Sequence, residues 1–302
     1  MPRLIYVALL LLSLIWGGSF YFIKLLLHDF GPWSIAFLRS FCGLVVVLFI
    51  MLIFKKPFAF RSLPWPAMFI MALINTALPW TLIGFSEQHL TSSMASILNA
   101  MTPVWTIIVG ILFFKSKSHY MQWVGIGVAT IGLVILLGIR PGALLSVNGI
   151  GLIGMLTATF CYAVGSQLSK RLSVRGSSMY QITYGTLLSS TIVSGTLAFS
   201  TESITWGHVS DMSNVPHIIG LGIFGSGFAY ILFYYMVEKG SAEFASMVTY
   251  LVPSTALIWG SVLLDEAIKW NMLAGLVIIL FGVFLASRKP RREAALKPRS
   301  VH

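Results

Sequence analysis

Apolar residues in this chain gather in long blocks, and polar or charged residues stand mainly between the blocks. A helix needs about 20 mostly apolar residues to cross the hydrocarbon core of a bilayer. Ten blocks come close to that length, and each is bounded by a charge, a Pro or Gly, or a short polar turn: 4–26, 33–54, 65–86, 91–114, 120–139, 148–170, 178–199, 215–236, 243–264 and 270–287. The pattern predicts an all-α integral membrane protein with ten transmembrane helices and both termini on one side.

The composition strengthens this prediction. Of 302 residues, 57% are hydrophobic and 10% are charged, whereas soluble domains have about 25% charged residues. So few charges cannot cover a soluble fold, which argues against a soluble enzyme or a nucleic-acid-binding protein. The net charge of +11 would suggest a nucleic-acid partner in a soluble chain. In a membrane chain, the distribution of the charged residues between the two sides of the membrane matters instead.

Sorting the charges gives an orientation. If both termini are cytoplasmic, 16 of the 20 Lys and Arg residues lie on the inner side. The net charge is then +13 inside, −3 outside and +1 within the membrane. This bias fits the positive-inside rule. We therefore expect a multi-pass protein of the cell (inner) membrane, with the lipid bilayer as a partner and without a nucleic-acid partner.

The two halves of the chain resemble each other weakly. Residues 91–136 align without a gap to residues 241–286 and share seven identities. They include the pairs Ala95/Ala245, Ser96/Ser246, Pro103/Pro253, Gly110/Gly260, Gly125/Gly275 and Gly132/Gly282. The alternative is chance similarity between apolar segments. Because each repeat would hold five helices, the second copy would be inverted in the membrane, as in many secondary transporters. The predicted parts are 1–140, 141–287 and a basic cytoplasmic tail, 288–302.

Several motifs resemble the drug/metabolite transporter superfamily, specifically its ten-helix EamA-type members. They are Trp16-Gly17-Gly18-Ser19-Phe20, Phe37-Leu38-Arg39-Ser40, Ala95-Ser96-Ile97 with Pro103, and Ala245-Ser246-Met247 with Pro253, Asp265 and Glu266. The resemblance implies a transporter, often an exporter of amino acids, metabolites or amphipathic compounds. The first copy has Lys115-Ser116 where the second has Asp265-Glu266, so the first copy departs from the family's pattern at that acid.

Polar and aromatic residues within the spans are the candidate substrate-binding residues. Polar side chains in a bilayer usually face protein or a water-filled cavity. The candidate set, with Trp16 added from the first motif, is Trp16, Asn75, Trp80, Asn99, Tyr162, Gln167, Tyr184, Tyr230, Thr249 and Tyr250. Asn99 and Thr249 each stand four residues before a Pro, where a freed carbonyl also needs a partner. Hydrogen bonding between helices and an interfacial aromatic belt remain alternative roles.

Arg39 is the one clear charge inside a span. Its side chain is expected either to reach back to the outer surface or to face a cavity and contact an anion or Glu87. No Asp or Glu lies deep in a span, and Glu87 near the outer end of the third span is the nearest substitute. Proton-coupled carriers often use such a carboxylate, so we expect transport that does not require a proton gradient.

Two other patterns have simpler explanations. Gly220 to Gly225 matches GxGxxG, but that motif needs a preceding strand, so close helix packing is favoured. The histidine spacings fit no metal-binding pattern, and no cofactor is expected.

The most favoured function is transport of a small organic solute by alternating access around a midplane cavity, by a monomer or homodimer. An integral-membrane enzyme or a channel is the alternative.

Overall fold

The computed structural model describes residues 4–58, 60–114, 120–137, 149–174, 177–239, 245 and 247–287. Every regular element in these residues is a helix, and most helices begin and end close to the predicted apolar blocks. The principal elements are α1 (Leu4–Leu26), α2 (Pro32–Ile53), η1 (Phe60–Ser62), α3 (Trp65–Ala72), η2 (Leu73–Ala77), α4 (Leu78–Glu87), α5 (Ser92–Asn99), α6 (Thr102–Phe114), α7 (Tyr120–Leu137), α8 (Gly149–Val174), α9 (Met179–Thr201), α10 (Trp206–Ser210), α11 (Val215–Ile218), η4 (Ile219–Phe228), α12 (Ala229–Lys239), α14 (Val248–Leu263) and α15 (Trp270–Ser287).

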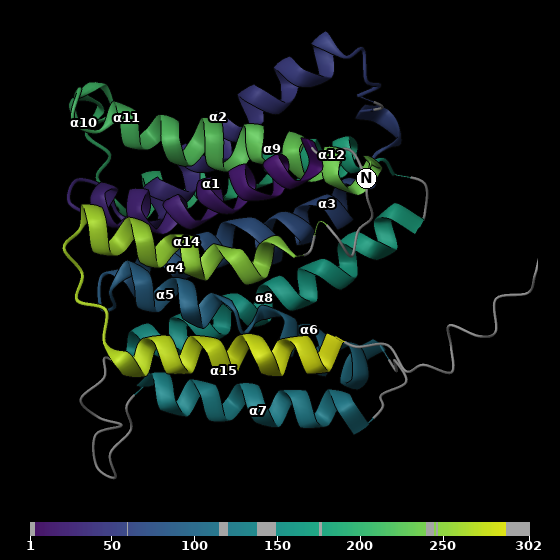
Figure 1. Cartoon of the computed structure of the whole chain (residues 1–302). Helices are drawn as coiled ribbons and strands as arrows, with labels where there is room; N and C mark the ends of the chain where they lie inside the picture. The colour runs from purple at the N-terminus through teal and green to yellow at the C-terminus, as the bar shows by residue number, and fades with distance from the viewer. Residues whose placement is uncertain are drawn as a thin grey trace, which may run out of the picture.

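These elements form ten apolar spans. Seven are long and apolar enough to cross a bilayer, and α7, α14 and α15 supply three shorter apolar helices. Three of the long spans are built from consecutive pieces: α3–η2–α4, α5–α6 and α11–η4–α12. The predicted all-α membrane fold is therefore confirmed. The helices lie side by side as one bundle, with α10 and α11 at one end and the N-terminus at the other (Figure 1).

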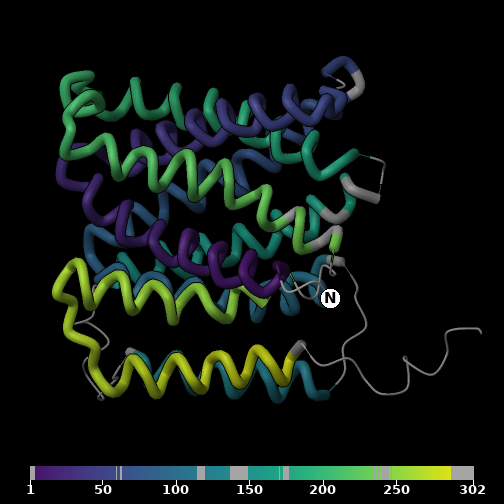
Figure 2. The backbone as a smooth tube through the Cα atoms, turned by 45° about the horizontal axis from the view of Figure 1, so that its top comes forward, coloured from purple at the N-terminus to yellow at the C-terminus, as the bar shows by residue number. Residues whose placement is uncertain are grey.

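The helices α7 and α15 form a close pair along one edge of the bundle (Figures 1 and 2). Their contact depends on glycines: a Cβ on Gly125 would lie 2.5 Å from the carbonyl oxygen of Gly282, and one on Gly132 would lie 3.0 Å from that of Gly275. Small residues let membrane helices approach this closely. Gly125 is equivalent to Gly275 and Gly132 to Gly282 in the two repeats. Each contact is therefore the image of the other, as a twofold axis requires.

A second pair of helices crosses the same axis. Ser40 of α2 and Ser190 of α9 are both buried, and their Oγ atoms lie 2.8 Å apart although the residues are 150 positions apart. This separation equals the sequence shift between the repeats, so equivalent residues meet each other. The other contacts follow the same symmetry, since α1 packs on α14 as α8 packs on α5 and α6. The inverted two-repeat architecture is thus confirmed.

The third and eighth spans also share an irregularity. Each contains a π-helical segment, η2 in the first copy and η4 in the second, and the two segments overlap after the shift between repeats. A π-helical segment changes the hydrogen-bond register and often marks a functional position. The fourth and ninth spans differ: the helix is interrupted between Asn99 and Thr102, whereas Pro253 lies within continuous α14.

Candidate functional site

Arg39 lies inside the bundle rather than at its surface. The residue is 8% exposed, and its Nε donates a hydrogen bond to Ser226 Oγ at 2.9 Å. The guanidinium carbon is 4.1 Å from the ring centre of Trp80, which is itself 5% exposed. Arg39 therefore faces the protein interior, and its positive charge is stacked on an aromatic ring.

Two tyrosines complete this group. Tyr162 of α8 and Tyr230 of α12 both lie within electrostatic range of Arg39, and the Tyr162 hydroxyl is hydrogen-bonded to the Trp80 side chain. Tyr230 occupies the position equivalent to Trp80 in the other repeat. The central site, as we call Arg39, Trp80, Tyr162, Ser226 and Tyr230, thus draws residues from α2, α4, α8, η4 and α12 of both repeats.

Close packing between α2 and η4 brings Ser226 to Arg39. A Cβ on Gly43 of α2 would lie 2.8 Å from Ser226 Cβ, and one on Gly227 would lie 2.5 Å from Val46. Glycines on both surfaces therefore let the two backbones approach. Trp16 of α1 holds the same turn from another side, since its Nε1 donates to the Gly225 carbonyl oxygen at 3.2 Å.

A buried acid lies beyond the central site, toward the α10 end of the bundle. Glu87 is 0% exposed, and neither carboxylate oxygen has a hydrogen-bond partner among the described residues. It lies within electrostatic range of Lys24, Glu266 and Arg39. The Lys24 ammonium donates to the main-chain carbonyl oxygens of Glu87 and Leu90, so it binds carbonyls at the C-terminal end of α4, where a cation is favourable.

Two further acids tie down helix N-termini at the same end. Glu202 accepts hydrogen bonds from the backbone N–H groups of Trp33 and Ser34 at 2.9 and 2.8 Å. Glu266 accepts from the backbone N–H groups of Ser92 and Ser93 at 2.7 and 2.9 Å. Carboxylates at helix N-termini satisfy free N–H donors and complement the helix dipole. Residues following α9 and α14 are therefore tied to α2 and α5.

The turn after α14 explains how Glu266 reaches α5. Asp265 has a φ of 52°, in the left-handed region that Asp tolerates better than most residues. The chain then reverses, and the Glu266 N–H donates to the Gly260 carbonyl oxygen at 3.1 Å. A Cβ on Gly260 would lie 2.6 Å from the Glu266 carboxylate, so the glycine leaves room for this acid.

A small cavity of about 70 Å³ lies on the other side of the central site, toward the N-terminal end. Its polar lining residues are Asn75, Thr76, Ser169, Thr183, Thr186 and Tyr230. Tyr230 belongs both to this lining and to the central site. The volume holds about two water molecules, so a solute can enter only after the helices move.

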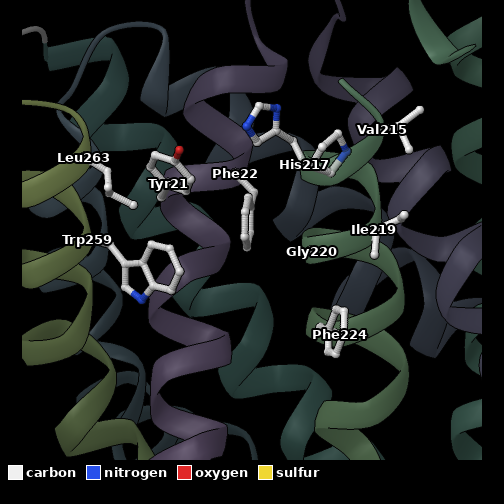
Figure 3. Close-up of a pocket in the computed structure, with 10 residues that line it drawn as sticks. Tyr21, Phe22, Val215, His217, Ile219, Gly220, Phe224, Trp259 and Leu263 are labelled. Atoms are coloured by element: carbon white, nitrogen blue, oxygen red, sulfur yellow. The ribbon is translucent and has the colours of Figure 1, made fainter. Parts of the chain in front are cut away.

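A larger groove of about 600 Å³ is separate from the central site. It lies between α1, η4 and α14, and its residues include Tyr21, Phe22, His217, Phe224 and Trp259 (Figure 3). The Tyr21 and Trp259 ring centroids are 5.4 Å apart. The groove has no Lys, Arg, Asp or Glu in its lining, so its surface is mainly aromatic and aliphatic.

The structure brings together four of the residues predicted from the sequence: Arg39, Trp80, Tyr162 and Tyr230. Trp16 is hydrogen-bonded to Gly225, the residue before Ser226. Asn75 lines the small cavity together with Tyr230. Ser226 was not predicted, because it stands in the glycine run 220–227, which indicates helix packing and gives no sign of a binding role.

The other predicted site residues lie elsewhere. Tyr184 packs against the rings of Phe58 and Trp65, with centroids 5.8 and 6.4 Å away. Thr249 is exposed, whereas Gln167 and Tyr250 are half-buried. Asn99 Oδ1 is buried without a hydrogen-bond partner in the described chain. Within that same part of the chain, no group of three or more His, Cys, Asp or Glu side chains could hold a metal ion.

The fold and the central site together define a class of protein. Two inverted repeats of five helices around a buried polar site are the architecture of a membrane transporter. The chain belongs to the EamA-like transporter family, whose model matches residues 3–138 and again residues 149–288. The resemblance to this family, and the transporter class that it implied, are confirmed.

Individual relatives agree over nearly the whole length. An uncharacterized transporter of Archaeoglobus fulgidus is 26% identical over 94% of this chain and 99% of its own. The uncharacterized inner membrane transporter YedA of Escherichia coli K12 is 24% identical over 94% of this chain and 92% of its own. A protein of known crystal structure superposes with a TM-score of 0.68 over 95% of this chain and 98% of its own, at 15% identity. That last likeness shows the fold alone.

Proposed function

We propose that this transporter is a carrier of the inner membrane that exports a small organic solute by alternating access. The central site between the two repeats is the observation that carries the proposal, because solutes bind at such an interface in carriers with inverted repeats. Three aromatic side chains and one cation offer an organic solute both apolar area and a polar contact. YedA, a relative over most of the chain, is itself named an inner membrane transporter.

The direction of closure supports a carrier that loads from the cytoplasm. With both termini cytoplasmic, as the positive-inside bias favours, the α10 end is the outer end. Lys24, Glu202 and Glu266 tie helix ends together there, and the small cavity lies on the cytoplasmic side of Tyr230. In this state the outer end is closed, and inward opening would widen the cavity toward the central site.

Comparison of two strains tests the proposed export. One strain overproduces the protein and the other lacks it, and small solutes are measured in cells and medium. Export predicts at least one solute that rises in the medium and falls in the cells of the overproducing strain. A solute that accumulates in those cells would indicate import instead, and identical profiles would contradict transport of a cellular metabolite.

We further propose that transport does not require a proton gradient. The Lys24 ammonium is bound to main-chain carbonyls rather than to the Glu87 carboxylate, so the nearest acid is not part of a hydrogen-bonded relay in the described residues. In proteoliposomes, collapse of a proton gradient should leave the flux of the exported solute unchanged. Glu87→Gln should have no more effect than the control Asp211→Asn, which changes an exposed acid. Solute-driven proton movement that is lost only in Glu87→Gln would overturn this proposal.

A further inference from the structure

We propose that the transported solute carries a carboxylate or a similar single negative charge next to an apolar or aromatic body, and that Arg39 binds this charge. The inference rests on the proposed carrier function and narrows its substrate class. It excludes organic cations, which would otherwise be equally good candidates for an aromatic cavity.

The first argument is that the Arg39 charge is not matched by a neighbouring acid. Arg39 makes no ion pair within 4 Å with any described acid. Arg39 donates through Nε to Ser226, and its two terminal nitrogens donate to no other described residue. Four of the five guanidinium N–H donors therefore remain available.

The second argument is energetic. A buried cation without a paired anion is energetically unfavourable, and charges within membrane spans therefore usually mark a substrate or ion pathway. Arg39 is 8% exposed and thus has little contact with solvent. An anion that arrives in the site would offset this cost, whereas a cation would add to it.

The third argument is the orientation of the guanidinium. Trp80 covers one face of the group at 4.1 Å, and Ser226 binds Nε. The edge with the terminal nitrogens makes no hydrogen bond to a described residue, and this fork matches the two oxygens of a carboxylate. Tyr162 and Tyr230 lie within electrostatic range of the same group, so their hydroxyls and rings can contact the rest of the solute.

The position of Glu87 leaves Arg39 without an acid partner in the part of the chain that the structure describes. Among the described residues, Glu87 is the acid within electrostatic range of Arg39, but it makes no ion pair with Arg39 within 4 Å. Glu87 lies toward the outer end, whereas the small cavity lies on the cytoplasmic side of Tyr230, which is within electrostatic range of Arg39. A solute anion that enters from that side therefore meets an Arg39 that Glu87 does not already occupy.

Three probes of equal length separate the possible charges: 3-phenylpropanoate, 3-phenylpropanamide and 3-phenylpropylamine. Binding to the purified full chain is measured from the rise in its thermal unfolding midpoint with probe concentration. We expect the propanoate to bind and the amine not to bind. Arg39→Gln should weaken propanoate binding roughly 10- to 100-fold, the range for loss of charged hydrogen bonds, and should leave the amide unaffected.

Two further variants control this experiment. Arg39→Lys keeps the positive charge without the fork, so it should retain a preference for the propanoate over the amine at reduced affinity. Arg61→Gln removes the same charge from an exposed residue of η1 and should bind all three probes as the wild type does. If Arg39→Gln does not fold, the ranking of probes by wild type and Arg39→Lys still decides the question. The proposal is overturned if the wild type prefers the amine or amide, binds no propanoate, or keeps its preference in Arg39→Gln.

Metabolite release separates this inference from the proposed function. Strains with wild-type protein and with Arg39→Lys are compared with the strain that lacks the gene. Anionic solutes whose release falls in Arg39→Lys support the inference. Release of neutral or cationic solutes only would overturn the inference and leave export standing. No dependent release at all would overturn both.

Discussion

The two repeats are alike where they pack against each other and different where they face the central site. Gly125 and Gly132 of α7 correspond to Gly275 and Gly282 of α15, and all four allow the same close contact across the axis. In the central site, by contrast, Arg39 corresponds to Ser189 and Trp80 to Tyr230. A symmetric interface requires equivalent residues, whereas a solute without symmetry is bound best by different ones.

The ends of the bundle differ in the same way. Lys24, Glu202 and Glu266 bind helix ends at the α10 end, and their counterparts after the shift between repeats are Val174, Leu52 and Ser116. The charged contacts that close one end therefore have no charged equivalents at the other. The two repeats therefore share a backbone fold, but different interactions hold the helix ends together at the two ends of the bundle.

The largest expected effect comes from disrupting the symmetric glycine contacts between α7 and α15. Gly125→Val would place a Cβ 2.5 Å from the Gly282 carbonyl oxygen, and Gly275→Val would place one 2.7 Å from Leu136 Cβ. Because backbone and packed side chains stand in the way, each change should cost about 1–3 kcal/mol or more. We expect loss of monodisperse protein on size exclusion, or a much lower unfolding midpoint, for both variants.

Gly127→Val is the matched control on the same helix. A Cβ at Gly127 meets nothing within 4 Å, so this variant should behave nearly as the wild type does. Equal damage from Gly127→Val and Gly125→Val would mean that helix propensity, and not the contact between α7 and α15, sets the cost. Damage from Gly125→Val without damage from Gly275→Val would contradict the symmetry of the pair.

Much of this fold was predictable, because the bilayer imposes a length and a composition on each span. The first predicted span, 4–26, has the bounds of α1, and the third differs from α3–η2–α4 by one residue. The π-helical segments and the interruption after Asn99 were not predicted. They change hydrogen-bond register while the residues stay apolar, and hydropathy does not report register.

The site was predictable as a set of residues but not as a set of contacts. Arg39, Trp80 and Tyr230 stood out because each is polar or aromatic within an apolar block. That Arg39 points inward depends on Ser226 and on the glycines that let η4 approach α2. Tyr184 has the same residue type as Tyr230 but packs near Phe58, because the face of a long apolar helix is decided by its neighbours.

Trp80 and Tyr230 occupy equivalent positions in the two repeats but differ in their contact with Arg39. Only Trp80 stacks on Arg39 at 4.1 Å within the described residues, and a cation–π contact contributes about 0.5–2 kcal/mol. Trp80→Leu should therefore weaken propanoate binding by more than Tyr230→Leu does, by roughly 2- to 30-fold relative to the wild type. Thermal-shift titration measures both, with Trp123→Leu on an exposed face of α7 as the control for loss of a tryptophan. A larger loss in Tyr230→Leu would mean that the site is centred on the second repeat.

The smallest effect concerns the one place where equivalent polar residues touch. Ser40 Oγ lies 2.7 Å from the Ala36 carbonyl oxygen and donates to it, so Ser190 must be the donor in the 2.8 Å contact between the two serines. Ser40→Ala and Ser190→Ala should each lower the free energy of unfolding by about 1 kcal/mol. The double variant should cost little more than either single one, because both remove the same bond.

Ser194→Ala is the control, since Ser194 is equally buried but bonds only within its own helix, to the Ser190 carbonyl oxygen at 2.6 Å. Its cost should add to that of Ser40→Ala. The measurement is a double-mutant cycle on unfolding midpoints in detergent, with the same cycle run for both pairs. Additive costs for Ser40→Ala and Ser190→Ala would show that this bond does not hold α2 and α9 together.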